Sequence, residues 1–232
     1  MCGRYTIIAK AEEIEKRFNV EVPESYKPRY NAAPTQILPV ITNDRPERLS
    51  FFHWGLIPGW AKDKSISTKL INARSETISE KASFKNALKY RRCLVIADGF
   101  YEWKKSTKKS KIPYRIFLNT KELFAFAGLW EEYEDDDQNT VHTFTIITTT
   151  ANSSISKIHD RMPVILEPQL EKSWLDPEFS SEDRINLLKP LNDNKIDYHP
   201  ISPLVNSVSN DHPQLILPAP PADQFGNLSL FD

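Results

Sequence analysis

The sequence predicts an α+β fold, a single domain with a curved, barrel-like mixed β-sheet and short flanking helices. Several segments show the alternating or continuously apolar pattern of strands, and short amphipathic segments lie between them without a regular β-α-β order. A chain of 232 residues is also long enough for one large domain, which should bury roughly 70% of its unfolded surface. We expect this domain to cover residues 1–209, and we expect a proline-rich tail, residues 210–232, to pack poorly.

The first half of the chain combines short strands with long loops. Ala11, Ile14 and Phe18 recur at helical spacing among charged residues, which predicts a short helix. An Asn-Asp-Arg-Pro turn between two apolar segments predicts a hairpin. The elements expected here are strand 4–8, helix 11–18, proline-rich extended coil 23–39, strands 37–41 and 49–54, a turn with two tryptophans 54–60, loop 71–77 and a short helix around Phe84 and Leu88.

The strongest strand signal in the second half is residues 92–103. It is interrupted at Asp98 and Gly99, and a glycine inside a strand pattern indicates a bulge or a tight bend. The other elements expected here are strands 114–118, 123–130, 143–149 and 162–166, one helical turn at 153–159, and helices at 170–175 and 182–188.

Composition restricts the class of protein. The net charge of −1 gives no global attraction to nucleic acid, so a polyanionic partner would need locally gathered positive charge. No apolar run approaches the roughly 18–20 residues of a membrane span, and no secretory signal opens the chain. We therefore expect a cytoplasmic protein without membrane contact.

Two cysteines, Cys2 and Cys93, argue against a disulfide scaffold and a cysteine-based zinc site, and we expect neither a metal nor a cofactor. Cys93 lies in an apolar run and is expected to be a buried small hydrophobe. Charges segregate into two runs, which we interpret as solvated turns. These runs are Lys104, Lys105, Lys108, Lys109 and Lys111, and Glu131, Glu132, Glu134, Asp135, Asp136 and Asp137.

The first six residues, Met1 to Thr6, carry the most distinctive chemistry. Initiator methionine is generally removed before a residue as small as cysteine, and Cys2 would then carry both a free thiol and a free α-amine. An α-amine has a pKa of about 7.7–8.0 against about 10.4 for lysine, so more of it is uncharged at neutral pH. Such an aminothiol can form a Schiff base with an aldehyde and close to a five-membered thiazolidine. The alternative is that Cys2 is an accident of the start codon.

Three polar residues, Asn72, Glu102 and His159, are flanked by strongly apolar segments. The aromatic setting of Glu102 should favour its neutral form and raise its pKa toward the range of a general acid or base. The alternative is a strand carboxylate that faces solvent, and a lone histidine such as His159 is more often structural. Cysteine, histidine and glutamate together also suit a thiol hydrolase, and spacing does not separate these readings.

Six blocks of sequence resemble the signature blocks of the SRAP family, the abasic-site processing proteins also described as SOS-response-associated peptidases. They follow one another in family order across about residues 2 to 205, so the resemblance is specific and identifies residues 1–209 as a SRAP domain. The blocks are Met1 to Tyr5, Arg29 to Pro34, Trp54 to Pro58, Asn72 to Glu76, Ala97 to Trp103 and His159 to Pro163.

The resemblance implies an enzyme of the DNA damage response that captures abasic sites in single-stranded DNA as a covalent crosslink, with DNA lyase activity as a further expectation. It implies that Cys2 supplies the amine and thiol that form the thiazolidine with the ring-opened sugar. It also implies that Asn72 holds the sugar and the amine, that Glu102 assists proton transfer at the amine, and that His159 protonates the ring oxygen of the sugar.

The DNA contacts implied by the resemblance are Arg4, Pro34, Trp60, Arg74 and Arg161. Arginine suits bidentate contacts with phosphate. Trp60 would stack on a base or wedge beside it. Trp54 is a second candidate for this role, and the alternative for Trp54 is a place in the core. Pro34 would shape the floor of the pocket. We expect little sequence preference and a marked loss of affinity with salt.

Two other functions remain open. A thiol-dependent peptidase using Cys2, Glu102 and His159 would cleave peptides without DNA, and its autoproteolytic form would release Met1. A single-stranded DNA-binding module without enzymatic activity would not need Cys2 at all. We expect the protein to be a monomer under each reading.

The chain ends in a segment that resembles the short peptide with which bacterial repair proteins dock on the β sliding clamp. This segment is Asn227, Leu228, Ser229, Leu230 and Phe231, with Asn227 in place of the usual glutamine. A proline-rich tether before it would suit a docking peptide. The alternative is a tail that packs Phe231 on the domain.

Overall fold

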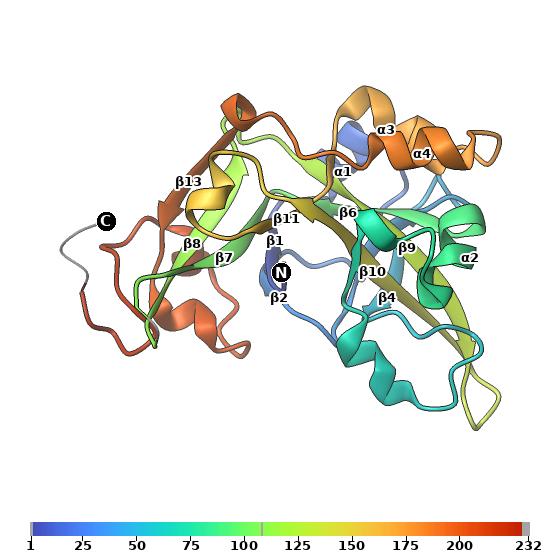
Figure 1. Ribbon diagram of the computed structural model, residues 1–232, viewed down its shortest axis with the longest axis horizontal. Helices are drawn as coiled ribbons and strands as arrows, with labels where there is room; N and C mark the ends of the chain where they lie inside the picture. Colours follow the sequence, from blue (N-terminus) through green and yellow to red (C-terminus); the bar gives the residue numbers. More distant parts are fainter. Residues whose placement is uncertain (1, 108, 229–232) are drawn as a thin grey trace.

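The computed structural model describes residues 2–107 and 109–228. Within these residues the strands form two sheets that meet near the middle of the molecule, and the α-helices lie beside the larger sheet (Figure 1). The strands are β1 Tyr5–Ile7, β2 Arg29–Ala32, β3 Ile37–Thr42, β4 Ser50–Trp54, β5 Asn72–Arg74, β6 Arg92–Ala97, β7 Gly99–Lys105, β8 Lys111–Leu118, β9 Phe124–Glu134, β10 Thr140–Thr150, β11 Arg161–Pro163, β12 Ile165–Leu166 and β13 Ile196–Pro200. The α-helices are α1 Ala11–Phe18, α2 Ala82–Tyr90, α3 Pro168–Leu175 and α4 Ser181–Leu187.

The larger sheet closes into a barrel. Its strands follow the order β10, β4, β3, β6, β9 and back to β10. The β10–β4 pair is parallel and the other pairs around the ring are antiparallel, so the predicted mixed, barrel-like sheet is confirmed. Beyond the ring, β5 and β11 pair with opposite edges of β10 at Thr148.

Aromatic side chains fill the barrel core where β1 meets it. The Tyr5 ring lies 5.3 Å from the Trp54 ring, and Trp54 stacks on Phe144 with an interplanar angle of 14°. All three side chains are buried, and such offset ring pairs add to the stability that their burial provides. The amino-terminal strand is therefore held against the barrel although its hydrogen-bonded neighbours belong to the other sheet.

The second sheet has the antiparallel order β13, β8, β7, β1, β2. The chain enters it directly from the barrel, because β6 ends at Ala97 and β7 begins at Gly99. A Cβ atom at Gly99 would lie 2.9 Å from both Thr6 Oγ1 and Arg115 Nε, so the close approach here requires glycine. The predicted bend at Asp98 and Gly99 is confirmed, and its role is to pass one continuous chain from the barrel to the second sheet.

The helices cover the barrel with their apolar faces. Trp174 on α3 is fully buried and donates from Nε1 to the carbonyl oxygen of Cys93 at 3.0 Å. Phe84 and Leu88 are the buried residues that the sequence predicted for α2. Cys93 is buried, as predicted. Across the described part of the chain, no helix is long and apolar enough to cross a membrane.

Three local predictions are corrected by the structure. Part of the predicted coil 23–39 forms β2, and part of the predicted loop 71–77 forms β5. Both strands are made by partners far away in sequence, β1 and β10, which a local pattern does not reveal. The charged runs are also less turn-like than predicted, because β9 continues to Glu134, and Lys104, Lys105 and Lys111 lie in strands.

The prediction of a poorly packed tail is wrong around Leu215, although Leu217, Phe225 and Leu228 are exposed. Leu215 is fully buried in a small second core with Tyr101, Ile201 and Val205. Proline content misled the prediction, because prolines break helices and strands but do not prevent an extended segment from burying apolar side chains. The division of the chain at residue 209 stays a prediction.

The end of the described tail lies along the β7–β8 hairpin. Gln224 Oε1 accepts a hydrogen bond from the main-chain nitrogen of Lys111 at 2.7 Å, and Ser110 donates to Asp223 at 3.0 Å. In the clamp-like peptide, Asn227 donates to Asp223 and Leu228 is 66% exposed. Its remaining residues, Ser229, Leu230 and Phe231, lie outside the described residues.

Candidate functional site at the junction of the two sheets

Strand β1 aligns the start of the chain with β7, so that Gly3 falls opposite Glu102 and Cys2 lies one residue further on. In the antiparallel β1–β7 pair, Tyr5 faces Phe100, and the main-chain nitrogen of Tyr101 donates to the carbonyl oxygen of Arg4 at 3.0 Å. Continuing this register brings the two residues before Arg4 alongside Glu102. The start of the chain is therefore aligned with the middle of β7.

A buried carboxylate holds the other end of β1. Asp98 accepts hydrogen bonds from Thr6 Oγ1 at 2.6 Å and from the main-chain nitrogen of Ile8, and Arg115 NH2 lies 3.0 Å from its Oδ1. Burial raises the pKa of Asp98, although these partners oppose that shift. Asp98 therefore joins β1 to the bend between the sheets.

Asn72, at the start of β5, holds the main chain of Cys2 from the barrel side. Its Nδ2 donates to the carbonyl oxygen of Cys2 at 2.9 Å. Cys2 itself is completely buried, and burial followed by the nearby charge of Glu102 raises the pKa of its thiol far above the ordinary value. The thiol lies 3.9 Å from the carbonyl oxygen of Arg4, a long sulfur contact. At neutral pH the thiol is therefore protonated in this arrangement.

Glu102 is buried, with 2% of its surface exposed, so the reading of a solvent-facing strand carboxylate is wrong. Burial raises its pKa to about 7. A carboxyl group with this pKa can accept or release a proton near neutral pH, which is the property that general acid–base chemistry needs.

His159 approaches Glu102 from the segment before β11. Its Nε2 lies 4.0 Å from Glu102 Oε2, and its Nδ1 accepts a hydrogen bond from the main-chain nitrogen of Arg161 at 3.0 Å. The Arg161 contact alone would leave the proton of the neutral ring on Nε2, on the side of Glu102, whereas the Asp160 carboxylate favours a proton on Nδ1. Asp160 Oδ1 lies 2.9 Å from Nδ1 on an 87% exposed side chain. Burial lowers the pKa of His159, which favours the neutral ring.

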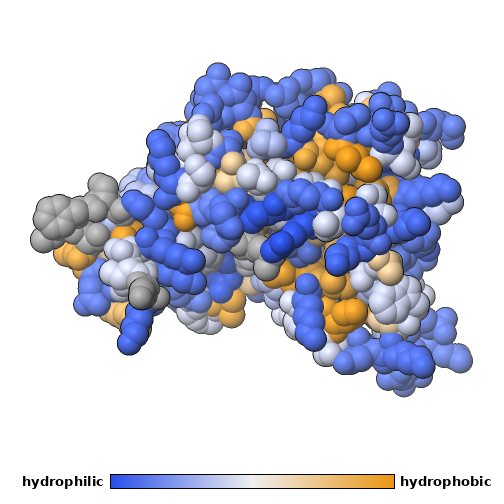
Figure 2. Space-filling model, in the orientation of Figure 1, coloured by the Kyte–Doolittle hydropathy of each residue, from blue (hydrophilic) through white to orange (hydrophobic). Residues whose placement is uncertain are grey.

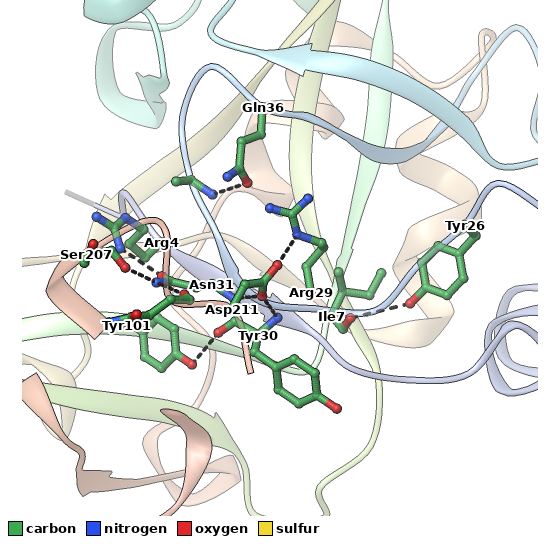
Figure 3. A network of polar contacts seen from close by, with 12 residues as sticks. Arg4, Ile7, Tyr26, Arg29, Tyr30, Asn31, Gln36, Tyr101, Ser207 and Asp211 are labelled. Carbon is green, nitrogen blue, oxygen red and sulfur yellow. Dashed lines mark hydrogen bonds and ion pairs between the residues drawn. The ribbon is translucent and has the colours of Figure 1, made fainter. Parts of the chain in front are cut away.

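The guanidinium of Arg4 is engaged with protein atoms on the other side of β1 (Figure 3). It donates to Asn31 Oδ1 at 2.8 Å, to the carbonyl oxygen of Val205 at 2.7 Å and to that of Asn206 at 3.2 Å. Burial lowers the pKa of Arg4. A phosphate contact at Arg4 would have to use the donors that remain.

Asn31 is the centre of this network. Its buried amide Nδ2 lies within hydrogen-bond distance of the carbonyl oxygens of Val205, Ser207 and Asn210. Next to it, Asp211 accepts from the main-chain nitrogens of Tyr30 at 2.6 Å and Asn31 at 3.0 Å. The network fastens the carboxy-terminal segment to β2 and thus supports the sheet that carries Glu102 (Figure 3).

The other two predicted arginines flank the end of β10. Arg74, on β5, is exposed, and its side chain makes no hydrogen bond or ion pair within residues 2–107 and 109–228. Arg161, on β11, donates from NH1 and NH2 to the two carboxylate oxygens of Glu76 at 2.5 and 2.9 Å. Its NH2 also donates to the carbonyl oxygen of Thr148 at 2.7 Å. The face in Figure 2 is mostly hydrophilic around its centre, where Figure 1 shows β1 and β11.

The remaining predicted DNA contacts are Trp60 and Pro34. Trp60 is 61% exposed and lines two surface hollows, with Pro58 and Glu132 in one and Lys62 and Lys69 in the other. Pro34 is half-buried.

Trp54 is a core residue, which was the alternative to its stacking on a base. It is completely buried, and its Nε1 donates to the carbonyl oxygen of Ile71 at 2.9 Å. A base could not stack on this ring without opening the barrel core.

A surface hollow of about 990 Å³ lies away from this site. Its lining includes Arg115, Phe117 and His199. Because Arg115 pairs with Tyr101 in the β7–β8 register, its side chain projects from the face opposite to that of Glu102. In the described part of the chain, no group of three or more histidine, cysteine, aspartate or glutamate residues could hold a metal ion.

Sequence reasoning missed Glu76, Asn31 and Asp98 as members of the site's surroundings. All three stand inside sequence blocks that were singled out, yet a polar residue in a motif gives no sign of whether it faces a ligand or another residue. The hydrogen bonds of Asn31, Asp98 and Asp211 join segments that are far apart in the sequence and meet only in the folded protein.

Comparison with known proteins identifies the family. A family model described as SOS response associated peptidase (SRAP) matches residues 1–208. The abasic site processing protein YoqW of Bacillus subtilis (strain 168) is 47% identical over 221 residues, which cover 93% of this chain and 99% of the relative. The abasic site processing protein HMCES of Rattus norvegicus is 35% identical, with 85% of this chain and 67% of the relative covered. A crystal structure of a protein from Bacteroides thetaiotaomicron superposes with a TM-score of 0.86 at 30% identity, covering 94% of this chain and all of that one. In sequence, motif order and fold, this chain belongs to the SRAP family.

Proposed function

We propose that this protein processes abasic sites in single-stranded DNA by forming a thiazolidine crosslink between Cys2 and the ring-opened sugar. The single observation that supports this most is the convergence on Cys2 of Asn72 from the barrel and Glu102 from the second sheet. A terminal aminothiol needs a group that fixes its main chain and a base that can take a proton from its amine. The printed names of the bacterial and vertebrate relatives support the same lesion as substrate.

The chemistry begins after Met1 has been removed. The uncharged amine of Cys2 attacks the aldehyde carbon of the open abasic sugar, and the resulting carbinolamine loses one water molecule to give a Schiff base. The thiol sulfur then adds to the imine carbon, while the thiol proton passes to the nitrogen. The product is a five-membered thiazolidine, and water is the only leaving molecule. A thiol that stays protonated until the imine forms suits this order of steps.

Glu102 and His159 take different parts in this scheme. With a pKa of about 7, Glu102 can accept a proton from the amine and return it to the departing hydroxyl of the carbinolamine. His159, when protonated on Nε2, can donate to the ring oxygen of the closed sugar and so help to generate the aldehyde. Asn72 keeps the carbonyl of Cys2, and with it the amine, in place.

DNA would reach this site along the exposed arginine and the edge of β10. Arg74 is the guanidinium best able to bind a phosphate, because protein acceptors do not compete for it among the described residues. Trp60 is sufficiently exposed to stack on a base, and Pro34 would border the strand. Arg4 and Arg161 would add phosphate contacts, with Arg161 shared between DNA and Glu76.

The test uses protein whose lack of Met1 has been verified by mass spectrometry. It is mixed with a single-stranded oligonucleotide carrying one abasic site, and the products are separated on a denaturing gel. We expect a heat-stable shifted band with the abasic strand and none with an intact strand of the same sequence. Absence of the band with correctly processed protein would overturn the proposal.

Two variants at Cys2 separate the steps. Cys2→Ser keeps the amine but removes the thiol, so borohydride should trap its Schiff base while no stable band forms without reduction. Cys2→Ala should behave in the same way, since its amine also remains. A heat-stable band from Cys2→Ala without reduction would exclude the thiazolidine, because alanine has no second nucleophile that could close a ring. Strand cleavage by either variant would report a lyase activity.

The peptidase activity in the family description is less well supported by the geometry. A thiol nucleophile depends on a lowered pKa, whereas burial raises that of Cys2. We therefore limit the proposed proteolysis to a single release of Met1. Incubation with denatured casein, with and without DNA, tests cleavage of other chains, and we expect none.

The proposed location and the proposed clamp contact both depend on the role in DNA processing. A DNA-processing monomer would work in the cytoplasm and would be associated with the nucleoid while bound. The clamp-like peptide, residues 227–231, would bring it to replicating DNA. A sliding-clamp pull-down with and without these residues tests this, and equal recovery would overturn the clamp proposal alone.

A further inference from the structure

In the Arg161–Glu76 pair, the Glu76 carboxylate occupies the position on the guanidinium where a DNA phosphate would bind. Both terminal nitrogens of Arg161 donate to the two oxygens of Glu76, the same two-point geometry with which arginine holds a phosphate. NH2 also serves two acceptors on Thr148. A phosphate that binds the outer edge of this guanidinium must therefore displace Glu76.

The pair spans the end of β10. Arg161 lies on β11, along one edge of β10, and Glu76 follows β5, along the other edge. The Arg161 side chain is 13% exposed and that of Glu76 is 45% exposed, so the carboxylate forms the solvent side of the contact. The outermost charge that an incoming strand meets at this point is therefore negative.

The neighbouring Arg74 gives the contrast. It precedes Glu76 by two residues, it is exposed, and it makes no ion pair in the described part of the chain. A strand can thus attach to Arg74 at once, whereas contact with Arg161 requires an exchange of anions. After that exchange, the displaced Glu76 carboxylate remains close to the phosphate and repels it.

We propose that Glu76 is an intramolecular competitor for DNA phosphate at Arg161, and that it shortens the time the protein spends on undamaged single strands. The inference rests on the proposed function, because it assumes that DNA passes Arg161. Capture of an abasic site is covalent and does not depend on a long non-covalent stay. Weak binding to intact DNA therefore increases discrimination between damaged and undamaged strands.

The experiment measures non-covalent binding of a fluorescent intact oligonucleotide by anisotropy between 50 and 200 mM salt, without an abasic site. Glu76→Gln removes the charge but keeps an oxygen that can accept from Arg161. We expect it to bind intact DNA about five-fold more tightly than the wild type, through a slower dissociation rate. One added phosphate contact should also make the salt dependence of the logarithm of affinity steeper by about 0.7.

Glu80→Gln is the matched control. Glu80 is also exposed, lies four residues further along the same segment, and makes no ion pair within the described residues. The two variants thus have the same net charge. Equal tightening by both would show a general charge effect and would overturn the proposal.

Arg161→Ala completes the test as a double-mutant cycle. In that background Glu76→Gln should change affinity less than two-fold, because the site of competition has been removed. Full tightening there would overturn the proposal, as would weaker binding by Glu76→Gln in the wild-type background. Thermal melting verifies that each variant folds, and Glu76→Ala, which should also tighten binding, replaces the glutamine variant if that one does not fold.

The two proposals fail in different ways. If the wild type does not bind intact or abasic DNA at low salt, both are overturned. If the wild type binds and crosslinks but Glu76→Gln gives no tightening, only the role of Glu76 is overturned.

Discussion

His159 Nε2 lies 4.0 Å from Glu102 Oε2, and the main-chain nitrogen of Arg161 fixes the opposite side of the ring. The Nε2 side of the imidazole thereby faces a carboxyl group whose pKa burial raises to about 7. A carboxyl group that exchanges a proton near neutral pH thus stands beside His159. Burial, and after it the charge of this carboxyl group, raises the pKa of the Cys2 thiol.

The rate of crosslinking should rise with pH through about 7, as Glu102 loses its proton and becomes able to accept one from the amine. Glu102→Gln should be slower by roughly 10²–10⁴-fold and should lose this rise, retaining only the dependence on the amine itself. Single-turnover rates between pH 5.5 and 8.5 measure both effects. A glutamine variant with the wild-type pH profile would remove Glu102 from the proton transfer.

Glu102 should also make the fold less stable as the pH rises. Its pKa is about 7 in the folded protein against an ordinary value of 4.5, so the folded state binds more protons than the unfolded state between these values. The free energy of unfolding therefore decreases from pH 4.5 to 7. Glu102→Gln has no carboxyl group to titrate at this position. Its free energy of unfolding, relative to that of the wild type, should therefore increase by on the order of 1 kcal/mol across that range. Urea denaturation at pH 5 and pH 8 tests the sign.

Asn31→Ala should destabilise the protein strongly. The buried Asn31 amide serves Arg4 and carbonyl groups of the carboxy-terminal segment, and its loss leaves these groups without their partner. We expect a loss of about 2–4 kcal/mol, because unsatisfied buried polar groups retain their full desolvation cost. Asn86→Ala, on the exposed face of α2, is the control and should change stability by less than about 0.5 kcal/mol. Equal effects of the two variants would contradict the role of Asn31.

The sequence was informative about local patterns and chemistry but not about long-range pairing. The apolar run that continues past Asp98 and the glycine after it predicted the bend correctly, because the signal lies within a few residues. The second sheet was not predicted as a separate layer, because β1 pairs with β2, 22 to 27 residues further along the chain, and with β7, 93 to 95 residues further along. The pairing of Arg161 with Glu76 was missed for the same reason.

Trp60→Ala should weaken binding to single-stranded DNA without affecting the fold. The ring is 61% exposed, so its removal costs little packing, whereas base stacking on an aromatic contributes about 1–3 kcal/mol. Affinity should fall by roughly ten-fold while the melting temperature stays within about 2 °C of the wild type. Trp60→Phe keeps an aromatic ring and should restore most of the affinity. Unchanged binding by Trp60→Ala would exclude stacking at this position.

Gly99→Ala tests whether the bend between the sheets depends on close packing. The added Cβ would lie 2.9 Å from Thr6 Oγ1 and from Arg115 Nε, and both side chains are held by the buried Asp98. Neither neighbour can move without breaking its bond to that carboxylate. We therefore expect a loss of about 2–4 kcal/mol in the free energy of unfolding.

Gly59→Ala is the matched control for this change. The nearest atom to its added Cβ would be the Glu132 carbonyl oxygen at 3.3 Å, which a surface turn can accommodate. Its effect should be below about 1 kcal/mol. Urea denaturation measures both variants, and the slope with denaturant should be the same if the unfolded states are alike. If Gly99→Ala were as stable as Gly59→Ala, the side chains of Thr6 and Arg115 would have to move away from the added Cβ at little cost. The hydrogen bonds of Asp98 could then not be what holds β1 in register.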